Sequence, residues 1–190
     1  MSDFPSHDLD TAPEASKPLL QNSLKAFGRL PGLHKVLAES PQAYEGYQLL
    51  HKLFSETEFD ADELTVVWQT INVEHECHYC VPAHTGIAKM MKVSDDITEA
   101  LRNETPLPSA KLEALRVFTL QMVRNRGNLT DAQMEAFFAA GYGHRAVLDV
   151  VLGLAQKTMS NYVNHMAQTP VDEVFKPLIW TRSSDHIAAE

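Results

Sequence analysis

Apolar side chains recur every three or four residues along most of this 190-residue chain, which is the spacing of helices with one buried face. Tyr44, Tyr47 and Phe54 show the pattern after Ser40, an N-cap that is followed by proline at the first helical position. The sequence contains no Asn-Gly or Asp-Gly pair that would join two alternating strands. The pattern therefore predicts an all-α fold.

Capping residues mark where several of these helices begin. Asp60 and Glu63 form a capping box, which predicts a helix that runs toward Glu74. Thr130 and Gln133 form a second one. The remaining predicted helices are a first amphipathic stretch over 13–27 that ends at the sequence RLPG, and segments near 94–103, 109–125, 130–140 and 144–168.

The length fits a single globular domain. We expect residues 1–15 to be a loose acidic tail, residues 16–180 to form the all-helical domain, and residues 181–190 to be a C-terminal tail.

The net charge of the chain argues against nucleic-acid and membrane partners. The chain has 16 Lys and Arg against 25 Asp and Glu, a net charge of -9, so it lacks the basic stripe that nucleic acid or an anionic membrane requires. The amino terminus has no positive flank and apolar run typical of a secretory signal, and Asp149 interrupts the most apolar segment. We expect a cytoplasmic protein with no nucleic-acid or membrane partner.

The candidate chemistry lies in the segment from Glu74 to His84, which reads E-x-x-C-x-x-C-x-x-x-H and holds the only two cysteines, Cys77 and Cys80. Pro82 is tolerated near a helix start and poorly in an interior, which predicts a helix that begins between Cys77 and Val81 and reaches about Met91. Cys80 and His84 would then share one helical face.

A thiol at a helix start is activated by two effects. The helix dipole stabilises the thiolate, and His84 can accept the thiol proton or pair with the anion. Glu74, at the end of the preceding helix, could orient His84. Glu63 is the other candidate carboxylate, although its capping box already explains it.

Other readings of the segment remain open. The two cysteines could be small buried hydrophobic residues, or zinc ligands with His75 or His78 completing the site. Val81 follows Cys80, which excludes the c-type haem motif. Asn161, Asn164 and His165 form a polar cluster on the last long helix, which we interpret as structural.

The segment from Glu74 to His84, with the preceding INV and the following TGIAKMMKVSDD, resembles the AhpD-like alkylhydroperoxidase branch of the carboxymuconolactone decarboxylase superfamily. The resemblance is clearest over 60–103 and continues more loosely to about 168. RLPGLHKVLAESPQAY also looks like the helical lead-in of its peroxidase-related members. The true lactone decarboxylases lack the cysteine pair.

The resemblance implies an all-helical, AhpD-like domain with the cysteine pair at the start of a central helix, and cysteine peroxidase activity. By resemblance, Cys80 attacks the peroxide, Cys77 resolves the sulfenic acid as a disulfide, and His84 is the family histidine. The glutamate of the founding alkylhydroperoxidases falls at Thr65, twelve residues before Cys77, whereas peroxidase-related members carry it at the place of Glu74.

The resemblance also implies a homo-oligomer, which we expect to be a trimer or hexamer. No metal or cofactor is expected, since the sequence has no flavin or nicotinamide fingerprint. An external dithiol, carried by a lipoyl-bearing or thioredoxin-like protein, would reduce the disulfide. The alternatives are a general thiol-disulfide oxidoreductase and a non-enzymatic metal-binding or scaffold oligomer.

Overall fold

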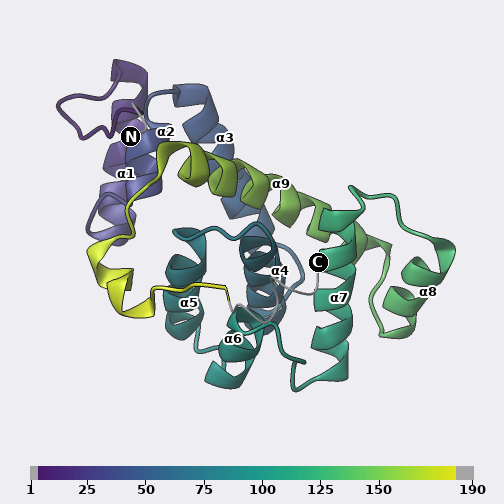
Figure 1. The fold of residues 1–190 in the computed structure, drawn as a ribbon. Coiled ribbons are helices and arrows are strands. Elements are labelled where there is room, and N and C mark those ends of the chain that lie inside the picture. The colour runs from purple at the N-terminus through teal and green to yellow at the C-terminus, as the bar shows by residue number, and fades with distance from the viewer. Residues whose placement is uncertain (1–3, 183–190) are drawn as a thin grey trace.

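The computed structural model describes residues 4–182, and within that range every regular element is a helix (Figure 1). The all-α prediction is confirmed. The elements are η1 (Glu14–Ser16), α1 (Lys17–Phe27), α2 (Gly32–Leu37), α3 (Pro41–Ser55), α4 (Ala61–Glu74), α5 (Cys80–Met90), α6 (Asp95–Arg102), α7 (Ala110–Arg124), α8 (Asp131–Ala139), α9 (His144–Ala167) and η2 (Glu173–Leu178).

The predicted caps form in the structure. The Ser40 hydroxyl accepts from the backbone of Ala43, and both capping boxes, at Asp60 and Thr130, are complete. Two elements were not predicted. α2 begins directly after Pro31, in the segment that the sequence indicated only as a break, and the short η2 follows Asp172.

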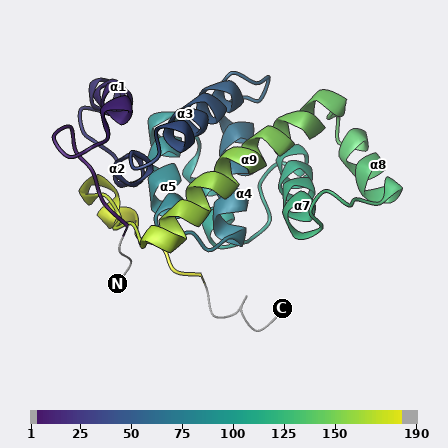
Figure 2. The same cartoon turned by 90° about the horizontal axis from the view of Figure 1, so that it is seen from above.

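The helix α9 crosses the molecule and organises it. It packs against α3 along one side and against α4 along another, while α1, α2 and η2 gather at one end and α7 and α8 at the other (Figures 1 and 2). Gly153 permits the crossing, since a Cβ there would lie 2.7 Å from the ring of Phe54 and 3.0 Å from Val67. Close approach at Gly153 brings the next turn of α9 over α5.

Buried apolar side chains form two clusters, and the cysteines belong to the smaller one. The larger cluster joins α4, α6, α7 and α8 around Trp68 and Phe118. The smaller one packs Cys77 and Cys80 against side chains of the N-terminal helices, including Leu20 and Tyr44. The site therefore lies where the N-terminal helices cover α5.

The N-terminal segment differs from the loose tail that we expected. The backbone N–H of His7 donates to the carbonyl of Lys35 at 3.0 Å, and the His7 ring lies 2.6 Å from the Glu39 carboxylate. Ala12 is buried in the smaller cluster. These contacts hold the described residues before α1 on the N-terminal helices. Residues 183–190 of the expected C-terminal tail lie outside the described residues.

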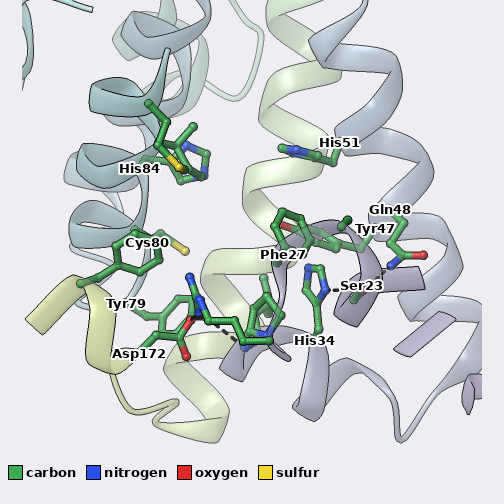
Figure 3. Close-up of a pocket in the computed structure, with 18 of the residues that line it drawn as sticks. Ser23, Phe27, His34, Tyr47, Gln48, His51, Tyr79, Cys80, His84 and Asp172 are labelled. Atoms are coloured by element: carbon green, nitrogen blue, oxygen red, sulfur yellow. Dashed lines mark hydrogen bonds and ion pairs between the residues drawn. The ribbon is translucent and has the colours of Figure 1, made fainter. Parts of the chain in front are cut away.

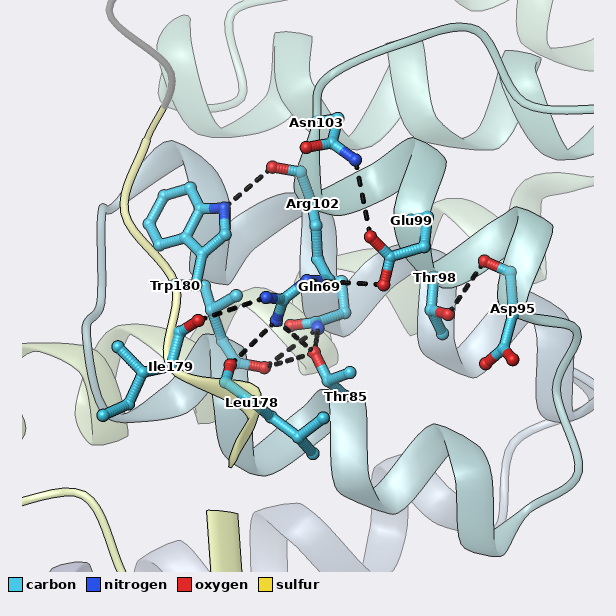
Figure 4. Close-up of polar contacts among 11 residues, drawn as sticks. Gln69, Thr85, Asp95, Thr98, Glu99, Arg102, Asn103, Leu178, Ile179 and Trp180 are labelled. Atoms are coloured by element: carbon cyan, nitrogen blue, oxygen red, sulfur yellow. Dashed lines mark hydrogen bonds and ion pairs between the residues drawn. The ribbon is translucent and has the colours of Figure 1, made fainter. Parts of the chain in front are cut away.

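The C-terminal segment crosses α5 and is fixed by Arg102 (Figure 4). The Arg102 guanidinium donates to the carbonyls of Leu178 and Ile179 at 3.1 and 3.4 Å, and to the Thr85 hydroxyl at 3.0 Å. The Trp180 indole N–H donates to the Arg102 carbonyl at 2.8 Å. These bonds hold η2 against α5. In the described part of the chain, no helix has the length and apolar character needed to cross a membrane.

Candidate active site

The two cysteines lie at the turn between α4 and α5. Glu76 has a positive φ of 51°, and the chain reverses there so that the N–H of Cys77 donates to the carbonyl of Asn72 at 2.9 Å. α5 begins at Cys80, so Pro82 falls in its first turn, where the missing N–H breaks no helical hydrogen bond. The predicted helix start is confirmed.

Cys80 lies in a polar environment although it is only 2 % exposed. Its Sγ accepts a hydrogen bond from the Asn164 amide at 3.3 Å. Burial opposes ionisation of this thiol. The hydrogen bond from the Cys77 thiol, the positive charge of Lys157 and the bond from Asn164 outweigh burial and lower the pKa of Cys80 to about 5. The arrangement stabilises a thiolate at Cys80.

Cys77 has the opposite character. Its thiol donates to Cys80, and it is fully buried; these two effects together raise its pKa above the ordinary value. Its sulfur also accepts the backbone N–H of Cys80 at 3.3 Å. Neither cysteine forms a disulfide. The surroundings of the pair therefore favour an ionised sulfur at Cys80 and a protonated one at Cys77.

His84 shares the cavity with Cys80, but its hydrogen bond runs elsewhere. Its Nε2 lies 2.9 Å from Nζ of Lys157, and its ring packs against Trp68 at 4.9 Å between centroids. Burial and the charge of Lys157 lower the pKa of His84 well below its ordinary value. The imidazole is thus neutral at pH 7, and among the described residues it makes no hydrogen bond to Cys80, which differs from the direct pairing that we expected.

The two candidate carboxylates lie outside the cavity. Glu74 forms a two-pronged ion pair with Arg124 of α7, at 2.6 and 2.9 Å, and makes no hydrogen bond to His84 within residues 4–182. Glu63 closes its capping box and also binds Lys111 at 2.8 Å and Tyr142 at 3.1 Å. The structure therefore does not bring Glu74 to His84 as its orienting partner.

Lys157 and Asn164 of α9 both contact the residues of the site. Lys157 was not predicted from the sequence, and the sequence indicated Asn164 only as part of a structural polar cluster. Both are fully buried, and they face α5 from the same side of the helix. Asn161, one turn before Asn164, donates to Asn72 at 3.0 Å, and Asn72 in turn donates to Gln69 at 3.0 Å. This row of buried amides fixes α9 against α4 and thereby holds Asn164 and Lys157 at the cysteines.

The other histidines near the pair bind backbone and amide groups. His75 lies 2.9 Å from the Asn161 side chain, and His78 lies 3.0 Å from the carbonyl of Thr169. His165 is exposed and stacks on His78. Across residues 4–182, no three His, Cys, Asp or Glu side chains are grouped as a metal site would require. This geometry gives no support to a zinc site at Cys77 and Cys80.

Cys80, His84 and Lys157 open onto a cavity of about 350 Å³ between α5 and the N-terminal helices (Figure 3). Figure 3 shows His34, Tyr47 and His51 facing Cys80 and His84 across this space. The rest of the wall is largely apolar or aromatic, and its other members include Ala26, Phe27, Leu33, Ala83, Ile87, Met90 and Phe175.

An ion pair closes one edge of the cavity. Asp172 accepts from Arg29 at 2.8 Å, from the N–H of Gly32 at 3.0 Å and from the Tyr79 hydroxyl at 2.8 Å. Arg29 also lies over the ring of Phe175 at 5.0 Å. The C-terminal segment thus forms part of the wall, beside the residue that precedes Cys80.

The chain has the fold of the AhpD core. It superposes on a peroxidase-related AhpD-core protein from Ralstonia eutropha with a TM-score of 0.82 at 17% identity, over 92% of this chain and 94% of that one. A peroxidase-related protein from a Silicibacter species gives 0.76 at 17% identity, over 91% and 94%. No protein-family model and no curated protein sequence matches this chain.

A third similar structure is a cysteine-to-alanine variant of the debrominase Bmp8 in complex with 2,3,4-tribromopyrrole, with a TM-score of 0.74 at 14% identity, over 93% of this chain and 95% of that one. The solved structures establish the architecture of this chain. Its chemistry has to be argued from its own side chains.

Proposed function

We propose that this protein is a thiol-dependent peroxidase in which Cys80 attacks a hydroperoxide and Cys77 resolves the product. The observation that carries the proposal is the asymmetry of the pair: the sulfur that lines the cavity is stabilised as a thiolate, and its neighbour is kept protonated. A thiolate is the nucleophile, and a protonated thiol within hydrogen-bond reach is placed to condense with a sulfenic acid.

The reaction balances with these two groups. The Cys80 thiolate takes the terminal oxygen of ROOH, which forms a sulfenic acid and releases an alkoxide that is protonated to ROH. Cys77 then condenses with the sulfenic acid, which forms the disulfide and water. An external dithiol reduces the disulfide and becomes a disulfide itself. We propose a lipoyl-bearing or thioredoxin-like protein as its carrier.

Stoichiometric hydroperoxide added to the reduced protein tests this assignment. Peroxide should disappear while two thiols and the mass of two hydrogen atoms are lost. Cys80→Ser should abolish consumption, whereas Cys77→Ser should complete one turnover and leave a sulfenic acid on Cys80 that dimedone traps. The reverse pattern would reassign the nucleophile, and a disulfide that forms only with added disulfides would indicate a general thiol-disulfide oxidoreductase.

A halogenated aromatic compound is a second candidate substrate, favoured by the aromatic side chains Phe27, Tyr47 and Phe175 in the cavity wall. The debrominase Bmp8 shares the fold and was solved with 2,3,4-tribromopyrrole. The two cysteines could reduce such a compound, with one aryl bromide, one thiolate and one thiol giving the arene, bromide and a disulfide. Bromide release from 2,3,4-tribromopyrrole by the reduced protein, without consumption of hydroperoxide, would favour this activity.

Assembly into a trimer or hexamer, and a cytoplasmic location, stay predictions. α9 leaves Leu148, Val151, Tyr162 and Met166 exposed, and a second copy of the chain could cover this apolar surface. Sedimentation that returned only the 21.2 kDa monomer at low micromolar concentration would contradict an oligomer.

A further inference from the structure

A lysine that is buried without a carboxylate partner lies in the wall of the cavity. Lys157 is 0 % exposed, and its ammonium group makes one hydrogen bond within residues 4–182, the 2.9 Å contact with Nε2 of His84. Lysine is almost never fully buried unless it is paired, because removing its charge from water is costly. A buried lysine without a salt bridge therefore points to a chemical use.

The groups that face Lys157 identify its counter-charge. Cys80 and His84 face it from α5, Cys77 from the turn before α5, and His51 from α3. Both histidines have a lowered pKa because they are buried. The Cys80 thiolate is therefore the anion that balances the ammonium group.

The hydrogen bond to His84 fixes the position of the ammonium group. A lysine ammonium carries three N–H groups. One of them donates to Nε2 of the neutral His84, which makes His84 a positioning residue. Lys157 also lines the cavity that Cys80 lines, so a substrate that reaches the sulfur shares this cavity with the remaining N–H groups of Lys157.

We infer that Lys157 is a catalytic residue: its ammonium group balances the Cys80 thiolate in the resting enzyme and donates the proton that the alkoxide takes up when the O–O bond breaks. The inference rests on the proposed peroxidase function. When the sulfur–oxygen bond forms, the negative charge of the thiolate passes to the leaving oxygen. A proton from Lys157 neutralises that oxygen and leaves a neutral amine.

The cycle returns this proton. Disulfide formation from the Cys80 sulfenic acid and the Cys77 thiol releases water and leaves the amine neutral. Reduction by the external dithiol then restores the Cys80 thiolate and the Cys77 thiol and releases one proton, which the amine takes up. Atoms and charges balance over the cycle without a metal or a further oxidant.

The test compares two oxidants, of which only one has a leaving group that must take up a proton when the O–O bond breaks. Cumene hydroperoxide releases a basic alkoxide, whereas peracetic acid releases a weakly basic carboxylate that leaves without a proton. Single-turnover oxidation of Cys80 is measured at pH 7 for the wild type and for Lys157→Met, which keeps the length of the side chain. Each rate is divided by the thiolate fraction of the same protein, taken from its iodoacetamide titration.

We expect Lys157→Met to lose about 10²-fold or more with cumene hydroperoxide, the usual contribution of a general acid, and less than about tenfold with peracetic acid. Lys89→Met is the matched control, because Lys89 is an exposed lysine on α5, and it should leave both rates unchanged. Equal losses with the two oxidants, or no loss with either, would overturn the assignment of Lys157 as the acid.

A second measurement uses the wild type alone and decides the question if the variant does not fold. The rate with cumene hydroperoxide should fall as the pH rises through the pKa of Lys157, which burial lowers from its ordinary value. A rate that stays constant into the alkaline range overturns the inference. If the wild type consumes neither oxidant, the proposed peroxidase function itself fails, which is a different outcome.

Discussion

The hydrogen bond from Asn164 to Cys80 gives the sharpest quantitative prediction. The Asn164 amide of α9 donates to the sulfur at 3.3 Å, and the Cys77 thiol is a second donor to it. Asn164→Ala removes this donor and leaves both cysteines in place. A hydrogen bond to a charged group contributes about 1.5–3 kcal/mol, and one pKa unit corresponds to about 1.36 kcal/mol. The variant should therefore raise the pKa of Cys80 by about 1–2 units.

The size of the shift sets where the effect is visible. Below the midpoints of both proteins, the thiolate fraction falls tenfold for each unit by which the pKa rises. A rise of about 1–2 units should therefore slow alkylation by iodoacetamide by about tenfold to a hundredfold in that pH range.

The assay is the pH profile of iodoacetamide alkylation in the Cys77→Ser background, which leaves Cys80 as the only thiol. Because Cys77→Ser also removes a hydrogen bond to Cys80, the variant is compared with Cys77→Ser alone, and the result is the difference between the two midpoints. His165→Ala is the control, because His165 is the next residue of α9 and is exposed. A profile of Asn164→Ala that matches that of His165→Ala would refute the role of the amide. The unfolding midpoint of both variants shows whether packing changed as well.

Two further predictions concern stability. Burial lowers the pKa of His34 and of His51 to about 4, so the unfolded chain binds more protons than the folded one below about pH 6.5, and stability falls as the pH is lowered. The loss between pH 8 and 5.5 should be about 1.4 kcal/mol for each histidine, and urea unfolding of His51→Phe should show about that much less pH dependence than the wild type. At Gly153, alanine should destabilise the fold by about 1–3 kcal/mol, because Phe54 and Val67 are buried and a Cβ meets them within 3.0 Å. Gly46→Ala, whose Cβ has only one neighbour at 3.9 Å, should instead stabilise it by up to about 1 kcal/mol; equal effects at the two glycines would contradict the close approach of α9.

The helices that surround the cysteines were predictable because the signals are local. The Asp60 capping box fixed the start of α4, and Pro82 confined the start of α5 to a few residues around Cys80. Caps and proline act through the backbone within one helical turn, so a single sequence contains the needed information. Cys80 and His84 could be placed on one face for the same reason.

The partners of these side chains depend on helices that are distant in the sequence. Glu74 is close to Cys77 along the chain, but its carboxylate turns to Arg124, fifty residues away. Lys157 and Asn164 fall at helical spacing with the buried Val150 and Gly153. The sequence therefore held one signal for these two site residues, which is that polar side chains lie on the face of the helix that is directed to the core. That pattern shows that α9 buries polar groups, but only the tertiary structure shows that they face Cys80.

The three histidines of the cavity add no charge beside the sulfur, where Lys157 and Cys80 carry the charge; the Arg29–Asp172 ion pair lies at the edge of the cavity. Burial lowers the pKa of His34, His51 and His84, so all three imidazoles are neutral near pH 7 and add no charge beside the sulfur. The Lys157 ammonium and the Cys80 thiolate then face each other in a poorly solvated space, where the attraction between opposite charges is stronger than in water. Burial lowers the pKa of Lys157, and the charges of Cys80 and Cys77 offset part of this effect. The loss of reactivity with rising pH should therefore follow the Lys157 ammonium, and a transition that persists in Lys157→Met would show that an imidazole carries the proton instead.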